Sequence, residues 1–153
     1  MKSTLFLIAI AIATLTTTGC ASTSKASVSK NSEALTFEAP ADRGSVFLYR
    51  TGRMVGAAGQ LQVRVNSQAA GGTGPGTFFR WDLKPGTYTL SSSTGESSAV
   101  VQIEVKAGEL YFVRQDARMG IESGRVTMKE VDDKQGKSEV SNCKLLVSSY
   151  VPE

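Results

Sequence analysis

Short stretches of alternating apolar and polar residues, which begin near residue 35, constrain the fold of this chain more than any other feature. Residues 61–66 read LQVRVN, so every second side chain is apolar, and residues 101–105 repeat the pattern. Successive side chains of a β-strand point to opposite faces, so each stretch predicts a strand with one buried face. Strands of this kind, separated by turn signals roughly every 8–12 residues, are typical of an antiparallel sandwich or barrel.

The same pattern, together with runs of β-branched and aromatic residues, predicts about seven strands. They cover residues 46–49, 61–66, 79–83, 87–90, 101–105, 110–114 and 126–131. Between the third and fourth strands, Lys84-Pro85-Gly86 predicts a type II turn, because proline presets φ at the first central position and glycine accepts positive φ at the second. These two strands are therefore expected to form a hairpin. The whole domain is expected to be an all-β, antiparallel sandwich of the immunoglobulin-like or transthyretin-like kind.

The C-terminal region leaves two interpretations open. Val140, Cys143 and Leu146 recur at helical spacing after a polar stretch, which favours a short C-terminal helix that covers a sheet edge. Residues 145–147 are consecutively apolar and would suit a strand equally well.

The N-terminal residues have the pattern of an export signal. A short basic start at Lys2 precedes nine apolar residues, 5–13. A membrane-spanning helix needs about 20 apolar residues, whereas the hydrophobic part of a signal peptide is short. Small residues then lead to Cys20 and resemble the lipobox of bacterial lipoproteins, although Thr17 stands three positions before the cysteine, where leucine is typical. The alternative is an ordinary signal peptide that is cut elsewhere, with Cys20 incidental.

We therefore expect a lipoprotein signal peptide over residues 1–19, a lipidated Cys20 that opens a flexible tether over 20–34, and a β-sandwich domain over 35–153. Residues 21–33 read ASTSKASVSKNSE and bury too little apolar surface to offset the entropy of ordering. The membrane, reached through lipid on Cys20, is the first expected partner. Ala21 follows the cysteine, a pattern that resembles sorting to the outer membrane, with the domain facing the periplasm.

Several segments, in a fixed order, resemble a known bacterial family. The segments are GSVFLYRTGRMVG (44–56), LQVRVN (61–66), FRWDLKPGTYTL (79–90), AGELYFVRQDARMG (107–120) and NCKLL (142–146). Together they are similar to the family called domain of unknown function 2846, over nearly the whole predicted domain. Members of that family are mostly small lipoproteins, which implies the same for this chain. The family carries no established activity, ligand or catalytic residue, so the resemblance implies nothing about mechanism.

The chain contains no histidine, which limits its chemistry. Histidine is the commonest general base and metal ligand, so Ser-His-Asp and Cys-His catalysis are excluded. The catalytic alternative is a histidine-free envelope hydrolase that uses a serine–lysine pair or Cys143. Ser-x-x-Lys begins at Ser22, Ser27 and Ser141, but the pattern arises by chance in a serine-rich chain, and Cys143 suits a small buried residue. We expect a protein that is not an enzyme.

Other binding motifs are weak. The glycine cluster at 71–76 lacks the Gly-Lys-Ser/Thr end of a phosphate-binding loop and predicts a mobile hairpin loop. Glu130, Asp132 and Asp133 lack the alternating spacing of calcium ligands, so neither a metal nor another cofactor is expected. The net charge of +3 is spread along the chain without a basic run, which argues against nucleic-acid binding.

Arginines near the predicted strand ends are the best candidates for a binding site. The candidate binding residues are Arg50, Arg53, Arg114 and Arg118, with Arg125 in the same group. Guanidinium groups bind carboxylates or phosphates bidentately, and peptidoglycan peptides, lipid headgroups and acidic envelope polymers carry such groups. The alternative is that these arginines pair with Asp116, Glu122 or Glu130 and only stabilise strand ends.

The leading hypothesis is a non-catalytic protein that binds or scaffolds an envelope polymer or an envelope protein. The arginines would supply polar contacts. Apolar contacts from an outward face could come from Tyr49, Phe78 or Tyr111.

Overall fold

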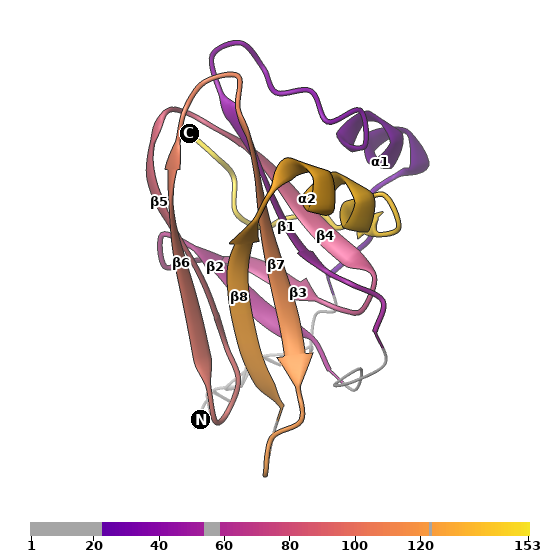
Figure 1. Cartoon of the computed structure of the whole chain (residues 1–153), viewed down its shortest axis with the longest axis vertical. Coiled ribbons are helices and arrows are strands. Elements are labelled where there is room, and N and C mark those ends of the chain that lie inside the picture. The colour runs from indigo at the N-terminus through magenta and orange to yellow at the C-terminus, as the bar shows by residue number, and fades with distance from the viewer. Residues whose placement is uncertain (1–22, 54–58, 123) are drawn as a thin grey trace, which may run out of the picture.

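The structure, a computed structural model, describes residues 23–53, 59–122 and 124–153. Within these ranges the chain forms two β-sheets and two short helices (Figure 1). The strands are β1 (Gly44–Arg50), β2 (Leu61–Val65), β3 (Gln68–Thr73), β4 (Thr77–Leu83), β5 (Gly86–Ser93), β6 (Ser98–Val105), β7 (Leu110–Arg118), β8 (Arg125–Val131) and β9 (Lys144–Leu145). The helices are α1 (Val28–Ala34) and α2 (Asp133–Val140). No helix of the described residues is long and apolar enough to cross a membrane.

The two sheets differ in strand direction. The four-stranded sheet has the order β3-β2-β5-β6 and is antiparallel throughout. The five-stranded sheet has the order β8-β7-β1-β4-β9 and is mixed, because β7 runs parallel to β1 and β9 runs parallel to β4. The predicted mostly-β class is confirmed, but the prediction of a wholly antiparallel fold is wrong. Parallel neighbours need long connections, and short-range alternation carries no information about them.

The inner faces of the sheets share one hydrophobic core. Its fully or almost fully buried residues are Val46, Leu48, Val63, Val65, Ala70, Phe79, Trp81, Leu83, Leu90, Ile103, Val105, Val113 and Leu146. In β2 the apolar residues are buried while Gln62 and Arg64 are exposed, as the alternation predicts. Strand β2 therefore contributes to the core through the residues that its sequence pattern selects.

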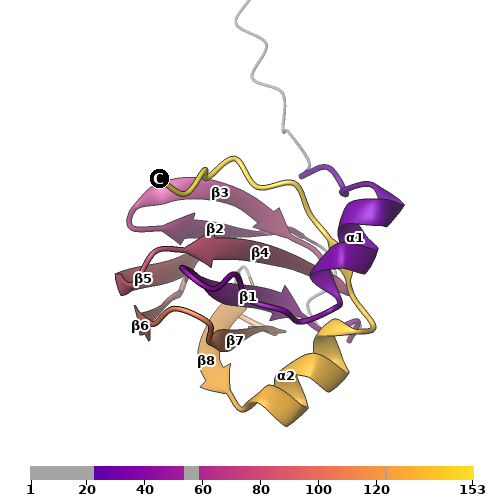
Figure 2. The ribbon, with the colours of Figure 1, turned by 90° about the horizontal axis from the view of Figure 1, so that it is seen from above.

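The outer face of the five-stranded sheet holds a second cluster, which explains why β1 is buried on both sides. Phe47 stacks on Phe112 with ring centroids 5.0 Å apart, and Tyr49 and Phe78 belong to the same cluster. Figure 2 shows α1 and α2 beside this face. Tyr49 and Phe78 are thus fully buried and cannot supply outward contacts, contrary to the prediction.

The C-terminal region contains both of the elements that the sequence left open. Helix α2 is followed by β9, which pairs with β4 through Phe78 and Leu145. The helix covers the face of the five-stranded sheet and not its edge, since Gly136 lies directly against the ring of Phe112. Asp132 caps the helix by accepting a hydrogen bond from the backbone N–H of Gln135 at 2.9 Å.

Two predicted hairpins are connections between the sheets. Lys84-Pro85-Gly86 joins β4 of one sheet to β5 of the other, because both edges of β4 are already paired with β1 and β9. The glycine cluster 71–76 is not one loop, since Gly71 and Gly72 belong to β3. Gly71 has φ +125, and a Cβ there would lie 3.1 Å from the Phe79 ring, so its lack of a side chain is a packing requirement.

The described part of the predicted tether is folded. Ala26 donates to the carbonyl of Leu145 at 2.8 Å, and Val147 donates to the carbonyl of Ser24 at 2.8 Å. Ser27 then caps α1. The prediction of a free tether is therefore wrong for residues 23–34, because a polar segment that buries little apolar surface is ordered by backbone bonds to a sheet edge. Cys20 and the predicted signal peptide lie outside the described residues.

Candidate functional site

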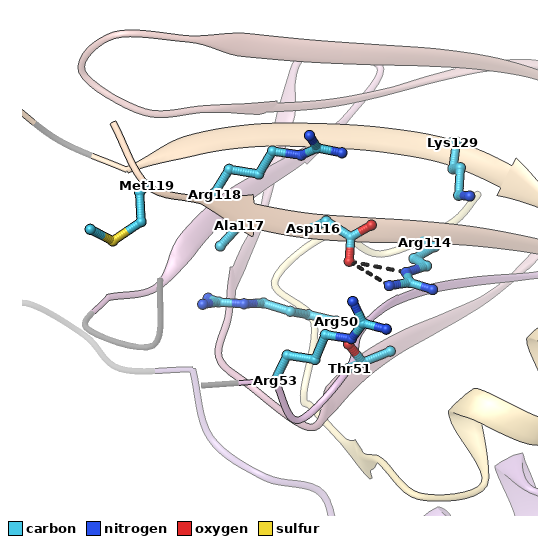
Figure 3. A pocket seen from close by; sticks show the side chains of 9 residues that line it. All are labelled: Arg50, Thr51, Arg53, Arg114, Asp116, Ala117, Arg118, Met119 and Lys129. Carbon is cyan, nitrogen blue, oxygen red and sulfur yellow. Dashed lines mark hydrogen bonds and ion pairs between the residues drawn. The ribbon is translucent and has the colours of Figure 1, made fainter. Parts of the chain in front are cut away.

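A pocket of about 410 Å³ lies where β1 and β7 end and β8 begins (Figure 3). It is lined by Arg50, Thr51, Arg53, Arg114, Asp116, Ala117, Arg118, Met119 and Lys129, and we call it the arginine pocket. All four predicted binding arginines line it. Five of the nine lining residues are cationic and one is anionic, which makes it a site of positive potential.

Strand alternation assembles most of the pocket. Arg114, Asp116 and Arg118 occupy every second position of β7 and therefore share the outer face of the sheet. Lys129 lies directly opposite Arg114 in the antiparallel β7–β8 pair. Because β1 runs parallel to β7, with Tyr49 level with Arg114, the end of β1 brings Arg50 to the same place.

Arg50 forms the inner wall of the pocket. Arg50 is 2% exposed, and its guanidinium donates a hydrogen bond to the carbonyl of Gly59 at 2.9 Å and to that of Thr73 at 3.4 Å. Burial lowers the pKa of this guanidinium from its ordinary value, and the nearby Asp116 carboxylate partly offsets that effect. An arginine side chain stays charged in proteins at neutral pH, so Arg50 is a fixed positive charge held by backbone carbonyls.

Arg114 is held by two carboxylates. Its Nε and Nη2 atoms both lie 3.0 Å from Oδ1 of Asp116, and its Nη1 donates to Oε1 of Glu139 at 2.9 Å. The hydroxyl of Tyr49 donates to the other oxygen of Glu139. The hydrogen bond to Asp116 raises the pKa of Arg114. This network ties β7 to α2 and β1, so the expected alternative role, ion pairing that stabilises the fold, applies to Arg114.

Three other cations remain available for a ligand. Arg53, Arg118 and Lys129 are exposed, and their side chains make no hydrogen bond or ion pair within residues 23–53, 59–122 and 124–153. An arginine with both edges of its guanidinium in water can bind a carboxylate or a phosphate through two parallel hydrogen bonds. The pocket therefore combines fixed charges at its base with free guanidinium groups at its mouth.

Comparison with known proteins places the chain in a family. Residues 40–128, more than half of the chain, match the family described as "Protein of unknown function (DUF2846)". The chain belongs to the DUF2846 family. An uncharacterized protein of Haemophilus influenzae (strain ATCC 51907 / DSM 11121 / KW20 / Rd) is 27% identical over 130 residues, which cover 84% of this chain and 77% of that protein. The predicted family resemblance is thereby confirmed.

The DUF2846 match includes most of the arginine pocket. Its limits, residues 40 and 128, enclose Arg50, Arg53, Arg114 and Arg118 but stop just before Lys129. Lys129 is not among the predicted binding residues, and strand register is the signal that could have indicated it. An antiparallel β7–β8 pair that turns near residue 121 places residue 129 opposite residue 114.

Arg125 is not part of the pocket, although it was grouped with the other arginines. It lies opposite Arg118 in the β7–β8 pair, and its Nε is 3.9 Å from Oε2 of Glu96. Its side chain is 53% exposed, so this ion pair contributes little to stability.

Among the described residues of the catalytic alternative, Cys143 is buried and Ser141 bonds to the backbone of its own helix. Cys143 is 2% exposed, and its Sγ lies 3.4 Å from the carbonyl of Glu139 and 3.6 Å from that of Arg50. Burial, with a contribution from the Glu139 carboxylate, raises the pKa of this thiol to about 11, whereas a nucleophilic cysteine needs a lowered pKa. Ser141 donates to the carbonyl of Lys137 at 2.7 Å, at the end of α2.

Proposed function

We propose that this DUF2846 protein is a lipid-anchored cell-envelope protein whose domain binds an anionic component without catalysis, through the arginine pocket. The observation that carries the proposal is the convergence of four arginines and one lysine on one pocket, with Arg53, Arg118 and Lys129 unpaired among the described residues. Single arginines are common at protein surfaces, but a pocket with this excess of positive charge favours carboxylate or phosphate ligands.

The proposed location follows from the N-terminal sequence. Nine apolar residues and a lipobox-like Cys20 support a lipid anchor, and Ala21 supports outer-membrane sorting with the domain in the periplasm. The two packed sheets support a sandwich related to the immunoglobulin-like or transthyretin-like kinds, with the parallel β1–β7 pair as a departure from both. The anchor and the pocket together describe a protein that holds an anionic envelope component close to a membrane.

The anchor is tested by mass spectrometry of the mature N-terminus. We expect Cys20 to be the first residue and to carry acyl groups, and a Cys20→Ser chain to move from the membrane to the soluble fraction. An unmodified thiol at residue 20, or retention of the variant in the membrane, would contradict the proposed anchor.

The pocket is tested by titration with a polyglutamate peptide and with inorganic phosphate, monitored by NMR at low ionic strength. An exposed ion pair contributes about 0.2–1 kcal/mol, so a double Arg53→Ala, Arg118→Ala chain is expected to lose about 0.4–2 kcal/mol, or roughly 2- to 30-fold in affinity. The matched control is Lys84→Ala, Lys106→Ala, which removes two exposed charges from the opposite ends of the strands. Equal binding by both double variants, each folded by circular dichroism, would refute the pocket as the binding site.

A further inference from the structure

We propose that the end of the domain that carries the arginine pocket lies against the anionic phospholipid headgroups of the membrane in which the chain is anchored. The loop between β7 and β8 would place Met119 and Ile121 among the lipids, while the neighbouring cations contact phosphates. This inference deepens the proposed function and rests on it, since it names phospholipid phosphate as the anionic group that the pocket binds.

The first observation is an apolar pair that protrudes into water. Met119 is 81% exposed and Ile121 is 88% exposed, two positions apart in the loop that follows β7. The loop is fixed to the domain, because the backbone N–H of Ile121 donates to Oε2 of Glu96 at 3.2 Å. A second hollow beside the arginine pocket shares Ala117, Arg118 and Met119 with it, so the apolar tip adjoins the cationic site.

The second observation is the charge around that pair. Arg53, Arg118 and Lys129 are exposed at the pocket, and the side chain of Arg125 at the start of β8 is 53% exposed. Glu122 is the exposed acid of the same loop. Three of these four cations make no ion pair among the described residues, whereas Arg125 is paired with the part-buried Glu96. Apolar side chains surrounded by arginine and lysine are the combination that binds an anionic bilayer surface.

The third observation is where the chain leaves the described domain. The hydroxyl of Thr23 accepts a hydrogen bond from the backbone N–H of Gly72 at 2.7 Å. The backbone carbonyl of Thr73, which follows Gly72 in β3, accepts a hydrogen bond from the guanidinium of Arg50 in the pocket. Thr23 is thus at the same end of the sheets as the arginines, and Figure 1 shows the loop after β7 at that end of the molecule.

The anchor cannot be far from this end. Three peptide units separate Cys20 from Thr23, and a fully extended chain spans at most about 3.6 Å per residue, so the lipidated sulfur lies within roughly 15 Å of Thr23. Because so short a segment joins Cys20 to Thr23, the domain has a high effective concentration at the bilayer surface, which favours contacts that would be weak in solution.

The experiment uses the full chain, purified from membranes with its anchor and reconstituted into vesicles. An environment-sensitive NBD fluorophore is attached at Ile121→Cys, and the matched control carries it at Lys84→Cys, at the opposite end of the domain. Cys143 is buried and should not be labelled in the folded protein. With phosphatidylglycerol vesicles we expect a blue-shifted emission at 121, quenched by brominated acyl chains, and neither effect at 84.

The dependence on charge separates lipid docking from passive proximity. Each basic residue near an anionic surface changes the contact equilibrium about fivefold, so Arg53→Ala with Arg118→Ala should reduce the ratio of docked to undocked protein roughly 25-fold. High salt or phosphatidylcholine vesicles should also reduce the signal at 121, whereas Lys84→Ala with Lys106→Ala should not.

Three results would overturn the inference. They are equal signals at 121 and 84, a signal at 121 that is the same on phosphatidylcholine, or no signal at 121. If the signal at 121 is absent while polyglutamate and inorganic phosphate still bind the pocket in solution, docking is refuted and the proposed function stands. If those soluble anions fail to bind as well, both proposals fail.

Discussion

Replacement of Gly136 by alanine tests the packing of α2 against the sheet. In an exposed helix interior this change stabilises a protein by about 1 kcal/mol, because glycine loses more backbone entropy on folding. Here a Cβ at residue 136 would lie 2.1 Å from Cγ and 2.5 Å from Cβ of Phe112, closer than real contacts allow. Overpacking of this kind costs typically about 1–3 kcal/mol and occasionally more.

The steric cost is expected to exceed the gain in helix propensity. Phe112 cannot move aside easily, since its ring is fully buried and stacks on Phe47. We therefore expect Gly136→Ala to lower the free energy of unfolding by about 2 kcal/mol, measured by urea denaturation followed by circular dichroism. The matched control is Gly74→Ala, where nothing lies within 4 Å of the added Cβ and little change is expected.

A second variant separates the clash from other effects. Phe112→Leu should be destabilising alone, but in its presence the further cost of Gly136→Ala should shrink, with a coupling of about 1 kcal/mol or more between the two positions. If Gly136→Ala proved as stable as the natural chain, or if the two changes were simply additive, α2 would not pack on Phe112 as described and the account of the outer cluster would be wrong.

Two further predictions concern the network below the pocket. Arg114→Ala should lower the free energy of unfolding by about 1–3 kcal/mol, because it leaves the half-buried Asp116 and Glu139 without their cation. Arg118→Ala should change the free energy of unfolding by no more than about 0.5 kcal/mol. Urea denaturation of both variants measures the difference. The Cys143 thiol holds its proton more tightly in the folded chain, with a pKa of about 11 against 9.0, so its contribution is complete below pH 9 and is lost as the pH rises toward 11. The stability of the natural chain should therefore fall more steeply over that window than that of Cys143→Ala, and equal slopes would contradict the assigned burial.

The sequence predicted the strands well because their cause is local. Val63 and Val65 are buried and Arg64 is exposed for the same reason that the pattern alternates: one face of β2 meets the core. The predicted connections between strands were wrong because strand pairing depends on residues that are far apart in the sequence. Lys84-Pro85-Gly86 has the residues of a hairpin turn, but β4 pairs with β1, whose residues lie 27 to 39 positions earlier, and with β9.

The prediction of a free coil for the N-terminal segment was wrong for a related reason. Residues 23–34 are polar and look like a free coil, yet they are ordered by backbone hydrogen bonds with 145–147, which no composition reveals. The second layer over Phe47 and Phe112 was missed in the same way. A strand buried on both faces reads as a continuous apolar run, as 46–49 does, but the run does not say that helices cover it.

The candidate site shows where sequence reasoning about arginines stops. Nothing in the sequence distinguishes the four arginines, Arg50, Arg53, Arg114 and Arg118. They meet at one pocket because β1 and β7 pair in parallel, and this pairing is not visible in the sequence. Their roles also diverge with burial. Arg50 and Arg114 are committed to carbonyls and carboxylates of the domain, so that their charge shapes the pocket without being free to grip a ligand. Arg53 and Arg118 retain exposed guanidinium groups, and the binding function proposed for this pocket therefore depends first on these two side chains.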